Sequence, residues 1–307
     1  MSSASVPAPR VPSSAVKRRL VVVGGPHSGA ALVRCLLGAY PGIHDVGDSG
    51  LFVEIAGRPR RYRPWTLVGL SSGRERRLLG RLLARERDEA GPVLPPRDPR
   101  LSRAFGDAVA TLDRMALSAG CRSWVEHTPG VPLQAAALER LIPRLRVVHV
   151  LRDGRDEVAA HCVRKARERG RGCRPAEAGD AVDRWNRAVA AHARCFGRRG
   201  HSYVLYEDLV QDPGRELRRL ARDCGLEDDA DAAAEAVAAV DLPEPRGDRA
   251  RFRELLQPER RRRLEGRLDL ERFGRLAERL RSDSLRVHFF QPKRPGGAAE
   301  PAATAPD

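Results

Sequence analysis

Short apolar runs alternate with longer amphipathic stretches along most of the chain. Four short runs have the pattern of strands, and the first is apolar and rich in β-branched residues, which is typical of a strand buried on both faces of a parallel sheet. These runs span residues 20–23, 122–126, 145–151 and 201–206. Apolar residues elsewhere recur at helical spacing, which predicts helices from Ser28 onward and over residues 75–90, 101–119, 131–141, 157–170, 176–195 and 229–240. This order predicts an α/β fold, a three-layer sandwich with a central parallel sheet and a ligand site at the carboxyl ends of its strands.

The first apolar run leads into a glycine-rich turn and then a helix. Residues 20–23 are followed by Gly24, Gly25 and Pro26, which end the strand, and leucines at helical spacing follow Ser28. Such a turn aims several backbone N–H groups and the helix N-terminus at one point, which suits a phosphate or sulfate group. Similar turns in other α/β proteins often bind nothing, so the turn alone leaves both interpretations open.

The turn lacks two groups of a nucleoside-triphosphate P-loop. Counted from Gly24, the second glycine of that motif is Gly29, and a lysine should follow it. The chain has Ala30 at that position, and Ala31 replaces the hydroxyl that holds magnesium. The strand–loop–helix unit is therefore present without the groups that bind a triphosphate together with magnesium.

The composition of the chain limits the kinds of partner it can bind and indicates how it divides into a domain and flanking segments. The 307 residues suffice for one large domain, and the formal net charge of +15 is carried mostly by arginine. This charge allows a polyanionic substrate, but nucleic-acid binding is disfavoured because no recognition motif is present and aromatic residues are not interleaved with the arginines. No apolar run approaches the roughly 20 residues of a membrane span, and the N-terminus lacks the apolar core of a secretory signal. We expect a disordered leader at 1–18, a domain at 19–290 and a disordered tail at 291–307.

The six cysteines are scattered and contain no Cys-x-x-Cys pair. This usage predicts reduced thiols in a cytoplasmic protein. His161, Cys162 and Cys173 lie near one another in the sequence, but their spacing fits no common zinc site. No metal site is therefore expected from the sequence.

Four segments carry a resemblance to a known family. They are P-H-S-G-A-A-L at 26–32, E-H-T-P at 126–129, R-D-G-R-D-E-V-A-A at 152–160 and Y-E-D-L-V-Q-D-P at 206–213. In the same order they resemble P-R-S-G-T-T-L, E-K-T-P, R-D-P-R-D-V-V-A-S and Y-E-D-L-x-x-D-P. These are motifs of the sulfotransferases, bacterial ones included, that use 3′-phosphoadenosine 5′-phosphosulfate. The resemblance covers roughly residues 20–275.

The resemblance implies a P-loop-like fold with a site for this nucleotide. The donor-binding residues that it implies are Gly25, Pro26, His27, Ser28, Gly29, Ala30, Ala31, Arg152 and Trp185. Arg152 would pair with the 3′-phosphate, whose oxygens suit a planar guanidinium. Trp185 would lie near the adenine, although a core tryptophan explains this residue equally well. C-terminal basic residues would fold back over the nucleotide, with candidates Arg246, Arg249, Arg251 and Arg253.

The resemblance also implies a reaction, the in-line transfer of a sulfuryl group to a hydroxyl or amine without a metal. Asp48 matches by position the glutamate that acts as general base in some branches, although Asp-Ser-Gly is also a good turn. His27 and His127 occupy the two positions at which the family has cations. They would stabilise charge on the bridging oxygen if an anion raises the pKa of each imidazole, or else these positions no longer serve catalysis.

Departures from the family motifs keep an alternative open. Ala30 and Ala31 replace threonines, and Ala160 replaces a serine that would contact the donor. The alternative is a catalytically impaired member that acts as a nucleotide-binding or interaction protein. For an active enzyme, the expected acceptor is a small molecule or a carbohydrate, under a variable helical lid or insert at 58–120. The sequence gives no oligomeric state.

Overall fold

The computed structural model describes residues 15–56, 70, 75–85, 98, 100–128, 138–139, 141–170, 172–242 and 258–282. Most of the helix expected over 131–141 lies outside the described residues. So do the four C-terminal arginine candidates, much of the expected lid, nearly all of the expected leader and the whole expected tail. The division of the chain into leader, domain and tail stays a prediction.

Within the described part of the chain, five parallel strands form one sheet in the order β2-β3-β1-β4-β5. The strands are β1 (Arg18–Gly24), β2 (Ile43–Gly47), β3 (Ser123–His127), β4 (Leu145–Leu151) and β5 (His201–Leu205). The chain extends the sheet first to one side of β1 and then to the other. The carboxyl ends of β3, β1 and β4 therefore meet where the winding reverses, the usual ligand position in such sheets.

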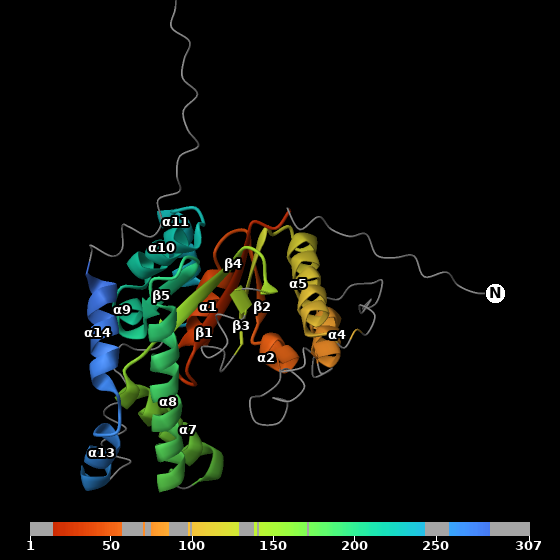
Figure 1. Ribbon diagram of the computed structural model, residues 1–307. Helices are drawn as coiled ribbons and strands as arrows, with labels where there is room; N and C mark the ends of the chain where they lie inside the picture. The colour runs from red at the N-terminus through yellow and green to blue at the C-terminus, as the bar shows by residue number, and fades with distance from the viewer. Residues whose placement is uncertain are drawn as a thin grey trace, which may run out of the picture.

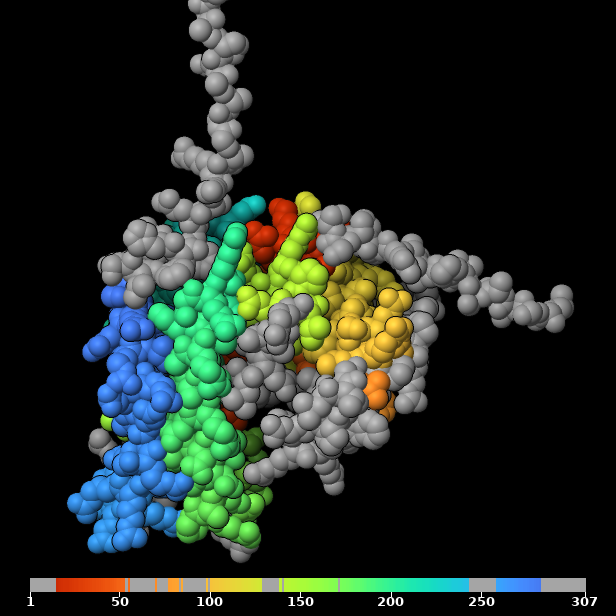
Figure 2. All heavy atoms as spheres, viewed as in Figure 1, coloured from red at the N-terminus to blue at the C-terminus, as the bar shows by residue number. Residues whose placement is uncertain are grey.

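Helices cover both faces of the sheet (Figure 1). They are α1 (Ala30–Gly38), α2 (Leu51–Ala56), α4 (Glu75–Arg85), α5 (Leu101–Ser118), α7 (Gly154–Arg169), α8 (Pro175–Cys195), α9 (Tyr206–Gln211), α10 (Pro213–Cys224), α11 (Ala230–Ala238), α13 (Pro258–Glu265) and α14 (Leu270–Arg281). Side chains alternate along β1. Leu20 and Val22 pack in a core with α1, α10 and α11, whereas Val21 and Val23 pack in a core with α2, α4 and α5. A third core joins α7, α8 and α14, and Figure 2 shows α14 lying along α8.

The predicted strands are confirmed as β1, β3, β4 and β5, and the α/β three-layer sandwich is confirmed. The sequence predicted no strand over Ile43–Gly47, yet these residues form the edge strand β2. Ile43 and Val46 are buried, and the register shifts between Asp45 and Gly47. None of the described helices has the length and apolar character needed to cross a membrane.

Candidate functional site

The glycine-rich loop connects the carboxyl end of β1 to α1. The Ser28 N–H donates to the Gly25 carbonyl oxygen at 3.1 Å, which closes a tight turn. His27 has φ 71°, a left-handed conformation that side chains other than glycine rarely adopt, and Gly29 has φ 90°. Left-handed residues within such a turn are typical of backbone nests that bind anions. The loop therefore has the backbone shape expected of a phosphosulfate loop.

Two polar atoms of this loop are buried without a hydrogen-bond partner among the described residues. The Ser28 hydroxyl oxygen and the His27 Nε2 form no hydrogen bond with any residue that the structure describes. Buried polar atoms are nearly always paired with protein, water or a ligand. Both atoms thus point to a polar group that binds at the loop.

Arg152 follows directly after β4 and contacts this loop. Its Nη1 donates to the His27 carbonyl oxygen at 2.9 Å, and the side chain is largely buried. The Arg152 guanidinium lies over the Tyr206 ring, 4.4 Å from the ring centroid, in a cation–π contact. Tyr206 in turn fills the space beside Gly29, where a Cβ would clash with its ring. Three segments far apart in the sequence are therefore packed together at one point.

The start of α7 is held by buried partners. The Asp153 carboxylate accepts from the Arg155 N–H at 2.9 Å as an N-cap, and the Asp153 N–H donates to Glu207 Oε1 at 2.8 Å. Trp185 of α8 is only 2% exposed, and its indole N–H donates to the Arg152 carbonyl oxygen at 3.0 Å. These bonds fix the backbone that carries the Arg152 side chain.

A small hollow opens beside the loop, between α7 and α8. It encloses about 170 Å³, open solvent included, and is lined by Pro26, His27, Glu157, His161, Ala181 and Arg184. Glu157 is packed against the loop backbone, because a Cβ on Gly25 would clash with its carboxylate. Burial raises the pKa of Glu157 to about 8, although Arg152 and Arg184 oppose the shift. The hollow thus combines the Arg184 guanidinium with a carboxyl group that is mostly protonated at neutral pH.

The two histidines of the hollow are neutral in the free chain. The His27 and His161 rings lie edge to face with centroids 5.6 Å apart. Burial, with the charge of nearby arginines, lowers the pKa of each imidazole to about 4. A cationic His27 therefore requires a bound anion, as the sequence analysis supposed.

Asp48 and His127, which were separate candidates in the sequence, are in contact. Asp48 follows β2, His127 ends β3, and their Oδ1 and Nδ1 atoms lie 2.9 Å apart. Arg34 of α1 also approaches, with its Nε 3.3 Å from Asp48 Oδ1. Burial lowers the pKa of His127. The Asp48 carboxylate opposes this shift but is the smaller effect, so the net pKa is lowered. His127 is thus a neutral imidazole with a carboxylate at one ring nitrogen, the arrangement of a general base with its orienting partner.

Glu126 ties the ends of β2 and β3 together beneath this pair. Its carboxylate accepts from the Ser49 hydroxyl at 2.5 Å and from the Thr128 hydroxyl, and it is completely buried. Burial raises its pKa to about 7. Because Ser49 is next to Asp48 and Thr128 is next to His127, these bonds help to hold the pair in register.

A protein-family model, described as the sulfotransferase family, matches residues 19–230 of the chain. The chain belongs to the sulfotransferase family. Among solved structures, it resembles the sulfotransferase domain from the Synechococcus PCC 7002 olefin synthase at 17% identity and a TM-score of 0.50, over 84% of this chain and 96% of that one. It also resembles the sulfotransferase STF1 from Mycobacterium tuberculosis H37Rv at 19% identity and a TM-score of 0.49, over 83% and 77%. A comparison with curated proteins gave no match.

At this identity, the Synechococcus domain shows that the fold is that of sulfotransferases, and the family match supports sulfuryl transfer as the general reaction. The geometry groups the predicted site residues into two places at one edge of the sheet. Arg152 joins His27 and the loop, and Asp48 joins His127. Trp185 lies beneath Arg152, so a direct contact between Trp185 and an adenine stays a prediction.

Sequence reasoning missed the site residues that act through packing. It treated Tyr206 of this sulfotransferase as part of a purely structural motif, yet the Tyr206 ring packs against both Arg152 and Gly29. It gave no role to Glu157 or Arg184, which line the hollow. Glu157 carries a signal in the sequence, since it places a carboxylate in a donor motif where the family has valine.

Proposed function

We propose that this sulfotransferase moves a sulfuryl group from 3′-phosphoadenosine 5′-phosphosulfate to a hydroxyl or amine of a small molecule or carbohydrate. The hydrogen bond between Arg152 and the His27 carbonyl carries this proposal. It puts the arginine expected at the 3′-phosphate against the loop expected at the 5′-phosphosulfate. One nucleotide can then contact both groups, which is what a donor with phosphates at both ends of its ribose requires.

The donor would bind mainly through backbone and buried polar groups. The N–H groups of Gly25, His27 and Gly29 would face the phosphosulfate, and the Ser28 hydroxyl would gain the partner that it lacks among the described residues. Pro26, Ala30 and Ala31 contribute only backbone and shape. The missing hydroxyl at Ala160 would cost about 1 to 2 kcal/mol of donor affinity.

The Asp48–His127 pair would accept the proton of the acceptor. With Nδ1–H donating to Asp48, the His127 Nε2 carries the lone pair that a general base needs. The acceptor oxygen attacks sulfur as its proton moves to Nε2. The bond between sulfur and the 5′-phosphate oxygen breaks, and 3′-phosphoadenosine 5′-phosphate leaves with the electron pair. This assignment makes Asp48 the orienting carboxylate rather than the base itself.

Charge on the departing phosphate would be stabilised by the loop. The loop amides are fixed in place before the reaction and therefore need no reorganisation. His27 would add positive charge only after the bound donor, an anion, has raised its pKa from about 4. Both Arg152 and Arg184 lie near enough to His27 to lower that pKa, so they supply positive charge at the same place.

A titration with two nucleotides tests the proposal and the impaired alternative. Calorimetry with 3′-phosphoadenosine 5′-phosphate should give micromolar binding, and adenosine 5′-phosphate, which lacks the 3′-phosphate, should bind at least tenfold more weakly. Labelled donor with a panel of hydroxyl and amine acceptors should then give transfer. Binding without transfer to any acceptor favours the impaired member, and no binding at millimolar nucleotide overturns the donor assignment. A cytoplasmic location, expected from the reduced cysteines, belongs to the same proposal.

A further inference from the structure

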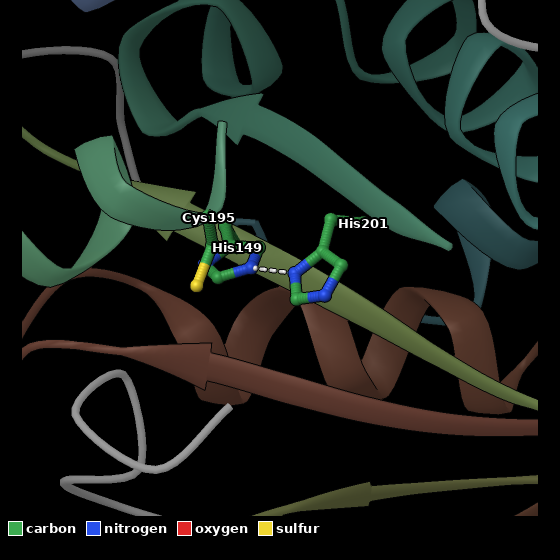
Figure 3. Close-up of side chains that lie close together, drawn as sticks. All are labelled: His149, Cys195 and His201. Carbon is green, nitrogen blue, oxygen red and sulfur yellow. Dashed lines mark hydrogen bonds between the residues drawn. The ribbon is translucent and has the colours of Figure 1, made fainter. Parts of the chain in front are cut away.

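A second cluster of titratable side chains lies in the core, outside the candidate donor and base sites. His149 comes from the middle of β4, His201 starts β5, and His192 and Cys195 lie in the last turn of α8. All four are at most 5% exposed. Figure 3 shows His149, Cys195 and His201 together, with a dashed line between the two rings. The cluster interrupts an otherwise apolar layer between the sheet and α8.

The imidazoles form a continuous chain of nitrogen contacts. His149 Nε2 lies 2.7 Å from His201 Nδ1, and His149 Nδ1 lies 2.8 Å from His192 Nδ1. At the far end, His201 Nε2 lies 3.3 Å from Glu139 Oε2. The His149 ring is also stacked on Tyr203, with centroids 4.4 Å apart. Each ring is therefore held in a defined orientation by its neighbours.

We propose that His149, Cys195 and His201 bind a zinc ion. One ligand atom from each residue lies within 4.8 Å of the other two. A set of imidazole nitrogens with one thiolate suits zinc, at about 2.0 Å for Zn–N and about 2.3 Å for Zn–S. Two nitrogens on one tetrahedral zinc lie about 3.3 Å apart. To admit the ion, the two nitrogens must move apart from their 2.7 Å separation, and both rings must turn so that their lone pairs converge on it.

The two histidines already have the outer partners that metal-ligating imidazoles usually have. If His149 and His201 ligate through the nitrogens that face each other, their other nitrogens are those held by His192 and Glu139. Such outer bonds fix the tautomer and the orientation of a ligating ring. The Glu139 side chain is 39% exposed, so the chain of contacts reaches solvent at this residue.

Zinc binds neutral imidazoles and a thiolate, so the Cys195 thiol must lose its proton when the ion binds. Binding then forms a Zn–S bond, and the thiol proton is released to solvent. The ion would tie α8 to β4 and β5, and β4 is the strand that leads to Arg152.

The test uses the full chain purified without chelator. Elemental analysis should find one zinc per chain. After zinc removal, titration with Co²⁺ should produce the near-ultraviolet charge-transfer band of a cobalt–thiolate bond. Cys195→Ser, which keeps the side-chain size, should abolish this band. The matched control is Cys224→Ser, because Cys224 is a buried free thiol on α10 and should leave the band unchanged.

A second variant tests the outer shell without removing a ligand. Glu139→Gln should lower the affinity for zinc about 10- to 100-fold. Chelator should lower the melting temperature of the wild-type chain but not that of Cys195→Ser. Folded wild-type protein that retains no zinc and gives no cobalt–thiolate band overturns the proposal and leaves a hydrogen-bonded imidazole chain. A band that persists in Cys195→Ser assigns the metal to another cysteine and also overturns it.

Discussion

The Arg152 side chain donates to the His27 carbonyl oxygen across 2.9 Å, although the two residues are 125 positions apart in the sequence. This bond joins the segment after β4 to the loop after β1, two neighbouring strands of the sheet. The left-handed backbone of His27 belongs to the same turn. Arg152 therefore both stabilises the loop and lies beside it, where it could bind the 3′-phosphate. The donor site proposed here depends on both roles.

Asp48→Asn should lower kcat/KM about 100-fold, within the range for loss of general-base assistance. In the wild type, kcat/KM should rise with pH and level off below the ordinary histidine pKa of about 6.5, since burial lowers the pKa of His127 and its neutral form is the active one. The carboxylate raises the pKa of His127, so its loss should also move the acidic limb of the profile to lower pH. Steady-state rates between pH 5 and 8 check this.

Asp45→Asn is the control for Asp48→Asn, because Asp45 also pairs with Arg34 but does not contact His127. It should leave the profile unchanged. A rate that instead falls as pH rises from 6 to 8 would show that a protonated group is needed rather than neutral His127, and the base assignment would be wrong.

Glu157→Gln should change how donor binding depends on pH. The Glu157 carboxyl lies against the loop and is protonated below its pKa of about 8. Above that pH, the carboxylate should repel the donor, and the dissociation constant for 3′-phosphoadenosine 5′-phosphate should rise up to about tenfold per pH unit. The glutamine variant should bind equally well at pH 7 and pH 9. The control is Glu168→Gln, an exposed residue of the same helix, and an identical pH dependence in both variants would remove Glu157 from the donor site.

Ala160→Ser restores the hydroxyl that the family motif has one turn into α7. A gain of about 1 kcal/mol, or roughly fivefold tighter binding of 3′-phosphoadenosine 5′-phosphate, should follow. Ala166→Ser, at a half-buried position further along the same helix, should have no effect. If both serines leave the affinity unchanged, the 3′-phosphate does not lie beside the first turns of α7.

The sequence predicted most of the fold because buried parallel strands are nearly continuous apolar runs. Residues 145–151 and 201–206 are of this kind, and both predictions are confirmed as β4 and β5. The strand β2 was not predicted, because apolar and polar residues alternate over Ile43–Gly47 and the segment contains His44 and Asp45. An edge strand with a register shift can have this pattern. Its polar residues indicated a loop.

The candidate site was predictable where a motif places residues on neighbouring strands. The contact between Arg152 and His27 follows from two strand–loop–helix units that share one edge of the sheet. The cluster of His149, Cys195 and His201 was not predictable, because 52 positions separate its two histidines and no spacing rule joins them. Only the pairing of β4 with β5, with α8 packed above, brings these side chains together.

Trp185→Phe should show whether the indole supports Arg152. Loss of the bond to the Arg152 carbonyl and of the ring volume should lower the free energy of unfolding by about 1 to 3 kcal/mol. Nucleotide binding should weaken severalfold as well. Trp124→Phe is the matched control, since this indole is equally buried but donates to Asp113. It should lower the free energy of unfolding by a similar amount in denaturant titrations without weakening nucleotide binding.

The most direct measurement is the calorimetric affinity of Arg152→Ala for 3′-phosphoadenosine 5′-phosphate and for adenosine 5′-phosphate. Arg155→Ala, a neighbouring arginine that pairs with Asp153, serves as control. We predict that Arg152→Ala loses the preference for the 3′-phosphorylated nucleotide by about 100-fold, as expected for a buried charged hydrogen bond, while Arg155→Ala keeps it. Equal discrimination by the wild type and Arg152→Ala would contradict the assignment of Arg152 to the 3′-phosphate.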